Sequence, residues 1–259
     1  MNAAIAAGAI LAVSAVFVVL GLGGGILFVP ILHWAGFDLG TAAIPLGLML
    51  NGLNTLLALI PYGRAGLVDW KGGLPMAAAA AITAPLGALA QPHLASGTVL
   101  ALFAGAVTLA AMRAVRGAAK KPALGSPAAT PAPHPRRLVF RLGVGAGVGF
   151  VGGLLGIGAG FVVAPALMAL GYPPRQTAAT TALVVTVCSF TGAAGYAGTM
   201  ELPGLLTALA AVAVIVGSQI GSRLMIKGAK PAWITWGYAA ILTAVAVKLL
   251  WEAAASSLG

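Results

Sequence analysis

Charged residues are scarce in this sequence. Only 7% of its 259 residues are Asp, Glu, Lys or Arg, whereas 60% are hydrophobic. A soluble domain carries about a quarter of its residues as charged side chains, so this chain cannot build a surface that faces water. A mean hydropathy of +1.04 points the same way. The composition therefore predicts a multi-pass membrane protein whose outer solvent is lipid.

Acidic residues and cysteine are scarcer still. The four carboxylates, Asp38, Asp69, Glu201 and Glu252, all lie near the ends of apolar runs. None is placed to act as a proton relay or sodium ligand in the middle of a membrane. The single cysteine, Cys188, excludes an internal disulfide and a multi-cysteine metal site. We expect no metal, no cofactor and no enzyme activity, because an intramembrane hydrolase needs a buried nucleophile with a base, or a bound metal.

Basic residues outnumber acidic ones by 14 to 4. In a soluble chain this excess would suggest nucleic-acid binding. Here the basic residues flank hydrophobic runs, as they do in the cytoplasmic loops of membrane proteins, so nucleic-acid binding is not expected. Half of them lie in one segment, at Arg113, Arg116, Lys120, Lys121, Arg136, Arg137 and Arg141.

Hydrophobic runs divide the chain into two halves. Between these halves, a segment rich in Pro, Ala and basic residues is typical of a flexible connector. We therefore predict a first membrane repeat at 1–116, a cytoplasmic linker at 117–137 and a second membrane repeat at 138–259. Runs long enough to span a bilayer, about 17–25 residues, lie near 3–20, 41–61, 73–91, 98–115, 138–155, 177–197, 202–222 and 232–251, with shorter apolar stretches at 25–36 and 159–171.

The two halves share a cluster of glycines followed by a proline. The match holds at a constant offset of 135 positions, and Tyr62 and Tyr196 match further on at an offset of 134. This regularity predicts an internal duplication in which the glycines, with the proline after them, break the first element of each half. The matched positions are Gly21, Gly23, Gly25, Pro30 and Gly36 in the first half, and Gly156, Gly158, Gly160, Pro165 and Gly171 in the second.

The distribution of charge favours opposite orientations for the two halves. If each half made four simple crossings, the basic loop at 223–230 would lie outside. If each broken first element turns back, as a re-entrant hairpin or two short crossings, this loop, the linker and the basic loop at 64–71 all lie inside. We therefore predict an all-α membrane protein of two inverted repeats, with 8–10 membrane segments and both termini outside. Each repeat has a glycine-broken or re-entrant first element plus three transmembrane helices. Secondary transporters with this plan bind their substrate near the midplane, at the repeat interface.

An ordered set of short motifs carries a family resemblance. The motifs are GLGGGILFVPIL at 21–32, YGRAGLVDW at 62–70, GIGAGFVVAPAL at 156–167, Ala-Thr-Thr at 179–181 and GSQIG at 217–221. Through them the chain resembles the TauE/SafE family, the sulfite-exporter-type membrane proteins, over most of its length. The resemblance implies transport of small sulfur-containing anions, such as sulfite or organosulfonates, across the inner membrane of a bacterium.

The glycine runs are candidate anion-binding elements. Glycine lets a helix break inside the membrane, and a helix N-terminus then presents free N–H groups and a partial positive charge to an anion. The alternative is close helix packing or a plain kink. On this basis we assign Gly23, Gly24, Gly25, Gly158 and Gly160 to the substrate site.

Polar side chains inside apolar runs are the second set of candidates. Uncharged amides and hydroxyls can replace the hydration shell of an oxyanion, although such groups also bond their own helix or bridge two helices. Asn54 and Ser189 are equivalent at the offset of 135, as are Asn51 and Thr186. We assign Asn51, Asn54, Thr180, Thr181 and Ser189 to the substrate site.

Three further residues are candidates for the pathway or for coupling. His33 lies after the first glycine run, Cys188 lies beside Ser189, and Gln219 lies in the GSQIG motif. Helix packing is the alternative for Cys188 and Gln219, since a lone buried cysteine usually packs as a small apolar side chain.

These features together predict a secondary transporter that exports a small sulfur-containing anion, with the lipid bilayer as its surroundings. An anion channel, a transporter of a non-sulfur organic acid and an assembly protein without a ligand are the alternatives. Whether the chain forms a homodimer is left open.

Overall fold

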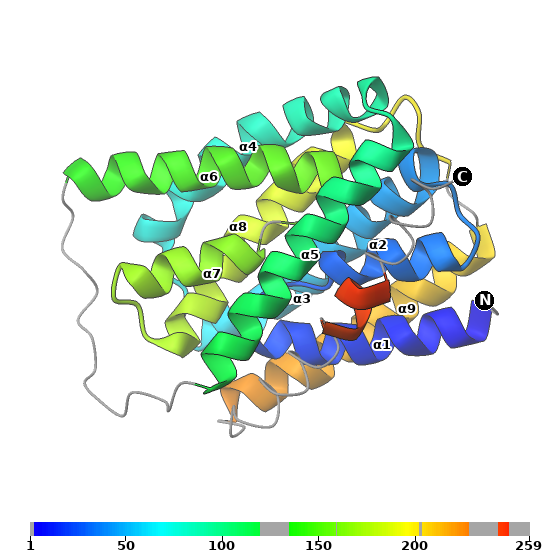
Figure 1. The fold of residues 1–259 in the computed structure, drawn as a ribbon. Helices are drawn as coiled ribbons and strands as arrows, with labels where there is room; N and C mark the ends of the chain where they lie inside the picture. Colours follow the sequence, from blue (N-terminus) through cyan, green and yellow to red (C-terminus); the bar gives the residue numbers. More distant parts are fainter. Residues whose placement is uncertain (1–2, 120–134, 159, 202–203, 228–242, 249–259) are drawn as a thin grey trace. The chain divides into compact units, whose positions relative to one another are not determined.

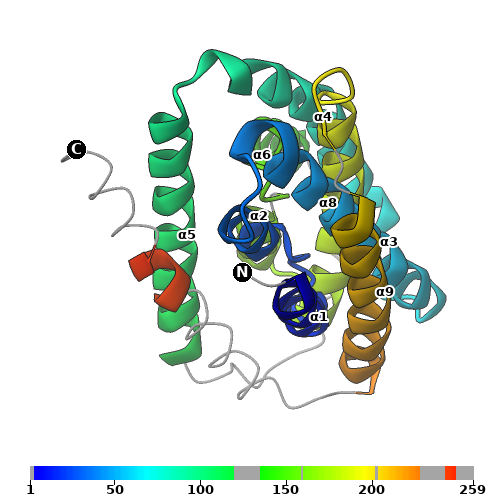
Figure 2. The same cartoon turned by 90° about the vertical axis from the view of Figure 1, so that its right-hand side faces the viewer.

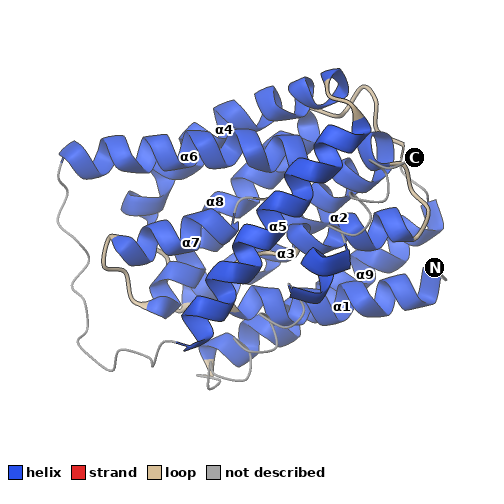
Figure 3. Ribbon diagram, viewed as in Figure 1, coloured by secondary structure: helices blue, strands red, loops and turns tan. Residues whose placement is uncertain are grey.

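Every regular element that the structure describes is a helix. The structure is a computed structural model of residues 1–259, and it describes residues 3–119, 135–158, 160–201, 204–227 and 243–248. Within these ranges there is no β-strand (Figure 3). The part of the predicted linker at 120–134 and most of the predicted last span at 232–251 lie outside the described residues.

The chain divides into two compact units. The larger unit comprises residues 1–91 and 127–227, and the smaller comprises residues 92–126 and 228–259. In the smaller unit the main described element is α5 (Ser96–Ala119). This division cuts across the predicted repeats of 1–116 and 138–259, because helices from both halves build the larger unit.

Among the described residues, the larger unit contains eight α-helices and one short helical turn, and a second short turn begins at its boundary with the smaller unit. Most of its helices run along roughly one direction in Figure 1, and α1, α2 and α6 are seen nearly end-on in Figure 2. The elements are α1 (Ala3–Val19), α2 (Gly25–Trp34), η1 (Leu39–Ala43), α3 (Ile44–Arg64), α4 (Trp70–Ala90), η2 (Gln91–His93), α6 (Pro135–Leu155), α7 (Gly160–Ala169), α8 (Pro174–Ala194) and α9 (Gly204–Ile226).

The described helices coincide with the predicted apolar runs to within a few residues, apart from the last run. Within the described residues, five helical stretches are long and apolar enough to cross a membrane. The chain is therefore a multi-pass membrane protein with an all-α fold. The five stretches are Leu39–Arg64, Trp70–His93, Leu138–Leu155, Pro174–Ala194 and Gly204–Ile226.

Aspartates start two of the elements. The Asp38 carboxylate accepts hydrogen bonds from the backbone N–H groups of Gly40 (3.0 Å) and Thr41 (2.9 Å), and so caps η1. Asp69 caps α4 in the same way, through the N–H of Gly72 at 3.0 Å. A side-chain oxygen at this position satisfies one of the free N–H groups of the first helical turn.

Contacts between the two halves occur in equivalent pairs. Helix α4 packs along α6, and its equivalent α9 packs along α1, the equivalent of α6. A Cβ atom added to Gly87 would lie 2.0 Å from the carbonyl oxygen of Phe150. A Cβ atom on Gly221 would lie 2.2 Å from the carbonyl oxygen of Ala15. Each close approach is therefore repeated when the two halves are exchanged.

The two matched tyrosines make equivalent hydrogen bonds. The hydroxyl of Tyr62 donates to the carbonyl oxygen of Val18 at 2.8 Å, and that of Tyr196 donates to the carbonyl oxygen of Gly153 at 2.9 Å. Both carbonyls belong to the last turns of α1 and α6, where a helix leaves its final C=O groups without internal partners. Each tyrosine thus satisfies the helix end that precedes the glycine break of its own half.

The equivalent helices α3 and α8 are in contact and run antiparallel. Asn51 is hydrogen-bonded to Ser189, and Thr55 is hydrogen-bonded to Thr186. The residue numbers therefore rise along α3 where they fall along α8. Antiparallel equivalent helices are what an inverted repeat requires. The placement of the two halves across a bilayer remains a prediction.

Candidate functional site

Glycines in the left-handed region make the chain reversals after α1 and α6. Gly21 and Gly23 have φ angles of 67° and 69°, and their equivalents Gly156 and Gly158 have 72° and 51°. Side chains disfavour these angles strongly. Figure 1 shows α2 and α7 turning back after these glycines. The prolines do not make the breaks, since Pro30 and Pro165 lie inside α2 and α7.

The two breaks touch each other inside the larger unit. A Cβ atom on Gly25 would lie 2.9 Å from the carbonyl oxygens of Gly156 and Ile157. A Cβ atom on Gly160 would lie 2.5 Å from the carbonyl oxygen of Leu22. Because Gly25 is equivalent to Gly160 and Leu22 to Ile157, this is again one contact made twice. Only glycine permits so close an approach of two backbones.

Asn51 of α3 joins the two breaks. Its Oδ1 accepts hydrogen bonds from the backbone N–H groups of Gly24 (2.6 Å) and Gly25 (2.8 Å) at the start of α2. Its Nδ2 donates to Ser189 Oγ at 2.8 Å, and a Cβ atom on Gly158 would lie 1.9 Å from Nδ2. Two N–H donors that converge on one atom require that atom to be the carbonyl oxygen, so the orientation of the amide is fixed.

The equivalent position in the second half behaves differently. Thr186, which matches Asn51, places its hydroxyl 2.7 Å from the carbonyl oxygen of Ala182 on its own helix and 2.9 Å from the hydroxyl of Thr55. Among the described residues no side chain accepts a hydrogen bond from the first N–H groups of α7. The hydrogen bonding at the two glycine breaks is therefore asymmetric.

Asn54 belongs to a neighbouring polar cluster. Its Oδ1 accepts a hydrogen bond from Ser14 Oγ at 2.6 Å, and its backbone carbonyl accepts one from Ser218 Oγ at 2.8 Å. All three residues are fully buried, yet Asn54 Nδ2 has no hydrogen-bond partner in the part of the chain that the structure describes. The sequence gives no indication of Ser14 or Ser218, because neither has a polar match in the other half.

The two predicted threonines are buried on α8 but differ in their partners. The hydroxyl of Thr180 accepts a hydrogen bond from the backbone N–H of Asp69 at 3.0 Å, at the start of α4. The hydroxyl of Thr181 is buried and has no partner among the described residues. Neither is hydrogen-bonded to the glycine breaks or to Asn51.

The three pathway candidates lie outside the contacts of Asn51. His33 is half-buried near the end of α2, with Nδ1 3.3 Å from the carbonyl oxygen of Phe37. Gln219 is half-buried on α9. Cys188 is fully buried in an apolar cluster with Val163, Leu167 and other side chains of α4, α6 and α8, which matches the packing alternative.

A buried cationic group lies near the start of α6, inside the run predicted to span the membrane at 138–155. Arg141 is only 8% exposed, and its Nη2 donates to the hydroxyl of Tyr172 at 2.8 Å. Tyr172 in turn donates to Asp69 Oδ2 at 2.5 Å. The guanidinium also lies 5.9 Å from the centre of the Tyr172 ring. This chain of contacts ties α6 to the loops before α4 and α8.

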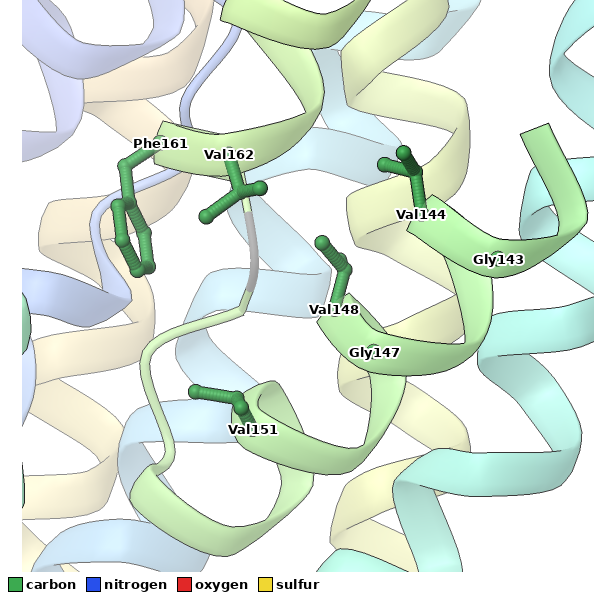
Figure 4. A pocket seen from close by; sticks show the side chains of 7 residues that line it. All are labelled: Gly143, Val144, Gly147, Val148, Val151, Phe161 and Val162. Carbon is green, nitrogen blue, oxygen red and sulfur yellow. The ribbon is translucent and has the colours of Figure 1, made fainter. Parts of the chain in front are cut away.

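An apolar groove lies between α6 and α7. Figure 4 shows valines of α6 facing Phe161 and Val162 of α7, and the groove has a volume of about 330 Å³. Its lining offers almost no polar atoms, so it cannot replace the hydration shell of an anion. The lining residues are Gly143, Val144, Gly147, Val148, Val151, Phe161 and Val162.

Negative charge is kept out of the interior of the described part. Asp38 and Glu201 are exposed and Asp69 is half-buried, so none of these carboxylates is fully buried. The backbone N–H of Thr41 is the main cause that lowers the pKa of Asp38. Within the described residues no group of three or more His, Cys, Asp or Glu side chains is placed to hold a metal ion.

Comparison with known proteins identifies the family. The model of the family "Sulfite exporter TauE/SafE" matches residues 5–249. The chain is 26% identical over 226 residues to "Probable membrane transporter protein YunE" of Bacillus subtilis (strain 168), covering 79% of this chain and 80% of that protein. It is 28% identical over 242 residues to "Probable membrane transporter protein y4hK" of Sinorhizobium fredii (strain NBRC 101917 / NGR234), covering 91% and 93%.

A plant protein matches a shorter part of the chain. "Sulfite exporter TauE/SafE family protein 3" of Arabidopsis thaliana is 30% identical over 117 residues, which cover 44% of this chain and 25% of that protein. No solved structure matches the chain at significant similarity. The family match covers nearly the whole sequence, and the two longer relatives are both named as membrane transporters. The chain therefore belongs to the sulfite exporter TauE/SafE family and is a membrane transporter of that type.

Proposed function

We propose that this protein is a secondary transporter that exports a small sulfur-containing anion, sulfite or an organosulfonate, across the inner membrane of a bacterium. The observation that carries the proposal is the pair of backbone N–H groups of Gly24 and Gly25, which converge inside the larger unit on Asn51 Oδ1. An oxyanion oxygen binds such a pair well, because the start of a helix carries a partial positive charge.

The rest of the site supports an anion over a cation. Ser189 accepts the amide N–H of Asn51, which leaves its own hydroxyl proton for another acceptor. None of the described carboxylates is fully buried, so the interior offers no fixed negative charge to hold a cation. The site in this conformation is closed by the contact of the two breaks, and substrate enters when they separate.

The antiparallel contact of α3 with α8 supports the inverted repeat that the charges predict. With the basic loops inside, the linker is cytoplasmic and both termini are periplasmic. The site then lies at the interface of the repeats, near the midplane, as in other transporters with broken helices.

The membrane potential is a sufficient driving force. An inside-negative potential favours exit of an anion by about 2.3 kcal/mol per charge per 100 mV. Export therefore needs no coupling carboxylate in the membrane. Uptake of radiolabelled sulfite into liposomes is expected to increase when an inside-positive potential is imposed. A flux that does not change with the imposed potential would contradict transport driven by the membrane potential alone.

Liposomes that contain the purified protein test the function itself. We expect saturable uptake of radiolabelled sulfite, and counterflow when unlabelled sulfite is present inside. Currents that do not saturate would favour an anion channel, and counterflow by carboxylates but not by sulfur oxyanions would favour an organic acid.

Ser189→Ala tests the location of the site. Loss of a hydrogen bond to a charged ligand should raise the half-saturating concentration of sulfite by about 10-fold or more. The matched control is Thr83→Ala, which removes a 2.8 Å bond from α4 to the carbonyl oxygen of Ala146 away from the breaks. Equal transport by both variants would remove Ser189 from the site.

A further inference from the structure

We propose that Asn51 is a specificity-determining residue whose side-chain oxygen takes the place of an anion oxygen when the site is empty. The inference rests on the proposed function and adds to it the requirement that a substrate must displace this amide. It assigns Asn51 the role of an internal competitor of the substrate.

The contacts of Asn51 resemble those of a bound oxyanion. One oxygen accepts both the Gly24 N–H at 2.6 Å and the Gly25 N–H at 2.8 Å. These donors belong to the start of α2, where the N–H groups have no partner within the helix. Helix starts use the same pair of donors to hold phosphate and carboxylate groups.

A closed, empty site needs such an acceptor. The backbone at Gly24 and Gly25 is buried, and an uncapped N–H away from water costs free energy. Asn51 removes this cost, because it is fully buried on α3 and reaches both donors. The amide oxygen is uncharged, however, and an ionised oxygen makes the stronger hydrogen bond. An oxyanion can therefore replace the amide, whereas an uncharged ligand cannot.

Only one half of the protein carries this acceptor. Thr186 stands at the position equivalent to Asn51, and its hydroxyl is engaged with Ala182 and Thr55. Exchange of side chain for substrate is thus confined to the start of α2.

This role predicts which small molecules bind. A ligand must be a better acceptor than an amide oxygen, which selects ionised oxyanions such as sulfite and methanesulfonate. Protonated acids and amides offer an uncharged oxygen that accepts hydrogen bonds no more strongly than Asn51 Oδ1, and amines offer no oxygen. These molecules therefore leave Asn51 in place.

The test measures thermal stabilisation of the full-length purified protein by sulfite and by methanesulfonate. Asn51→Asp keeps both backbone hydrogen bonds and adds a negative charge that neither anion can displace. It should fold with an unliganded midpoint at or above that of the wild type, with a half-saturating concentration at least about 10-fold higher. Asn51→Ala removes the competitor, so it should be less stable without ligand and should bind sulfite about 10-fold more tightly.

Thr83→Ala serves as the matched control. It also removes a side-chain hydrogen bond between helices, but away from Asn51, and should leave the half-saturating concentration unchanged. The proposal is overturned if Asn51→Asp binds sulfite as the wild type does, or if Asn51→Ala binds it more weakly. Should Asn51→Ala fail to fold, Asn51→Asp decides alone. A wild-type protein that responds to neither anion overturns the proposed function, and this inference with it.

Discussion

Tyr172→Phe removes one hydroxyl that bridges two charged groups. That hydroxyl accepts a hydrogen bond from Arg141 Nη2 at 2.8 Å and donates one to Asp69 Oδ2 at 2.5 Å. The ring remains, and with it the contact at 5.9 Å between the ring centre and the Arg141 guanidinium. The substitution therefore isolates the two hydrogen bonds from the packing of the side chain.

The expected loss follows from the burial of the two partners. A hydrogen bond to a charged group contributes about 1.5–3 kcal/mol. Asp69 is half-buried and can turn to water, so only part of its bond is lost. Arg141 is 8% exposed, and its Nε has no hydrogen-bond partner among the described residues, so its guanidinium can replace little of the lost hydrogen bonding with water. We expect the free energy of unfolding to fall by about 2–4 kcal/mol.

Tyr62→Phe is the matched control for this prediction. It deletes the same atom from a fully buried tyrosine, but the lost bond joins two uncharged groups, Tyr62 and the carbonyl of Val18. Its expected cost is about 1 kcal/mol. Reversible unfolding of both variants in mixed micelles measures the difference. If the two variants lose equal stability, the bridge between Arg141 and Asp69 contributes nothing beyond an ordinary hydrogen bond, and the reasoning is wrong.

Three further predictions concern packing, pH and thiol access. Gly153→Ala should lower the free energy of unfolding by about 1–3 kcal/mol, because its Cβ would lie 1.9 Å from the carbonyl oxygen of Ala84. The control is Gly147→Ala on the same helix, whose Cβ would have no atom within 4 Å. It should be neutral or stabilising in the same unfolding assay. The lowered pKa of Asp38 means that its cap on η1 stabilises the fold above the ordinary aspartate pKa of about 3.9 and is lost as the pH falls through the lower folded value. The thermal midpoint of Asp38→Asn should therefore depend less on pH in acid than that of the wild type, and parallel curves would contradict this. Cys188 is fully buried, so the folded protein should resist maleimide labelling that proceeds once it is unfolded in detergent, and rapid labelling of the folded state would place Cys188 on an open path.

The sequence predicts most of the fold because the physical signals are long and repeated. An apolar run of about 20 residues specifies a membrane helix with little ambiguity, and α3, α4, α6, α8 and α9 appear where those runs lie. The glycine clusters at an offset of 135 predict two equivalent breaks. The sequence does not show which residues make the chain reversals. The glycines make them through positive φ angles, whereas Pro30 and Pro165 lie inside the short helices α2 and α7.

The sequence predicts the composition of the site better than its connections. It selects Asn51, Ser189 and the glycines, which the structure brings together. It cannot show that Asn51 Oδ1 meets the start of α2, because helical periodicity does not reveal which face of α3 meets a loop 27 residues earlier. The partners of Arg141 are not predicted for a related reason. Tyr172 and Asp69 are distant from it in the sequence, and only the fold places them beside it.

The pairing of α1 with α9 has a consequence for how the protein is made. The main packing partner of α1 is α9 (Gly204–Ile226), which follows almost two hundred residues later in the chain. During synthesis α1 therefore stays in the bilayer without that partner until nearly the whole chain has been inserted. The face of α1 that later packs against Gly217 and Gly221 is then open to other membrane helices. Assembly of this protein is thus a late, concerted event, in which neither half can complete its core before the other has arrived.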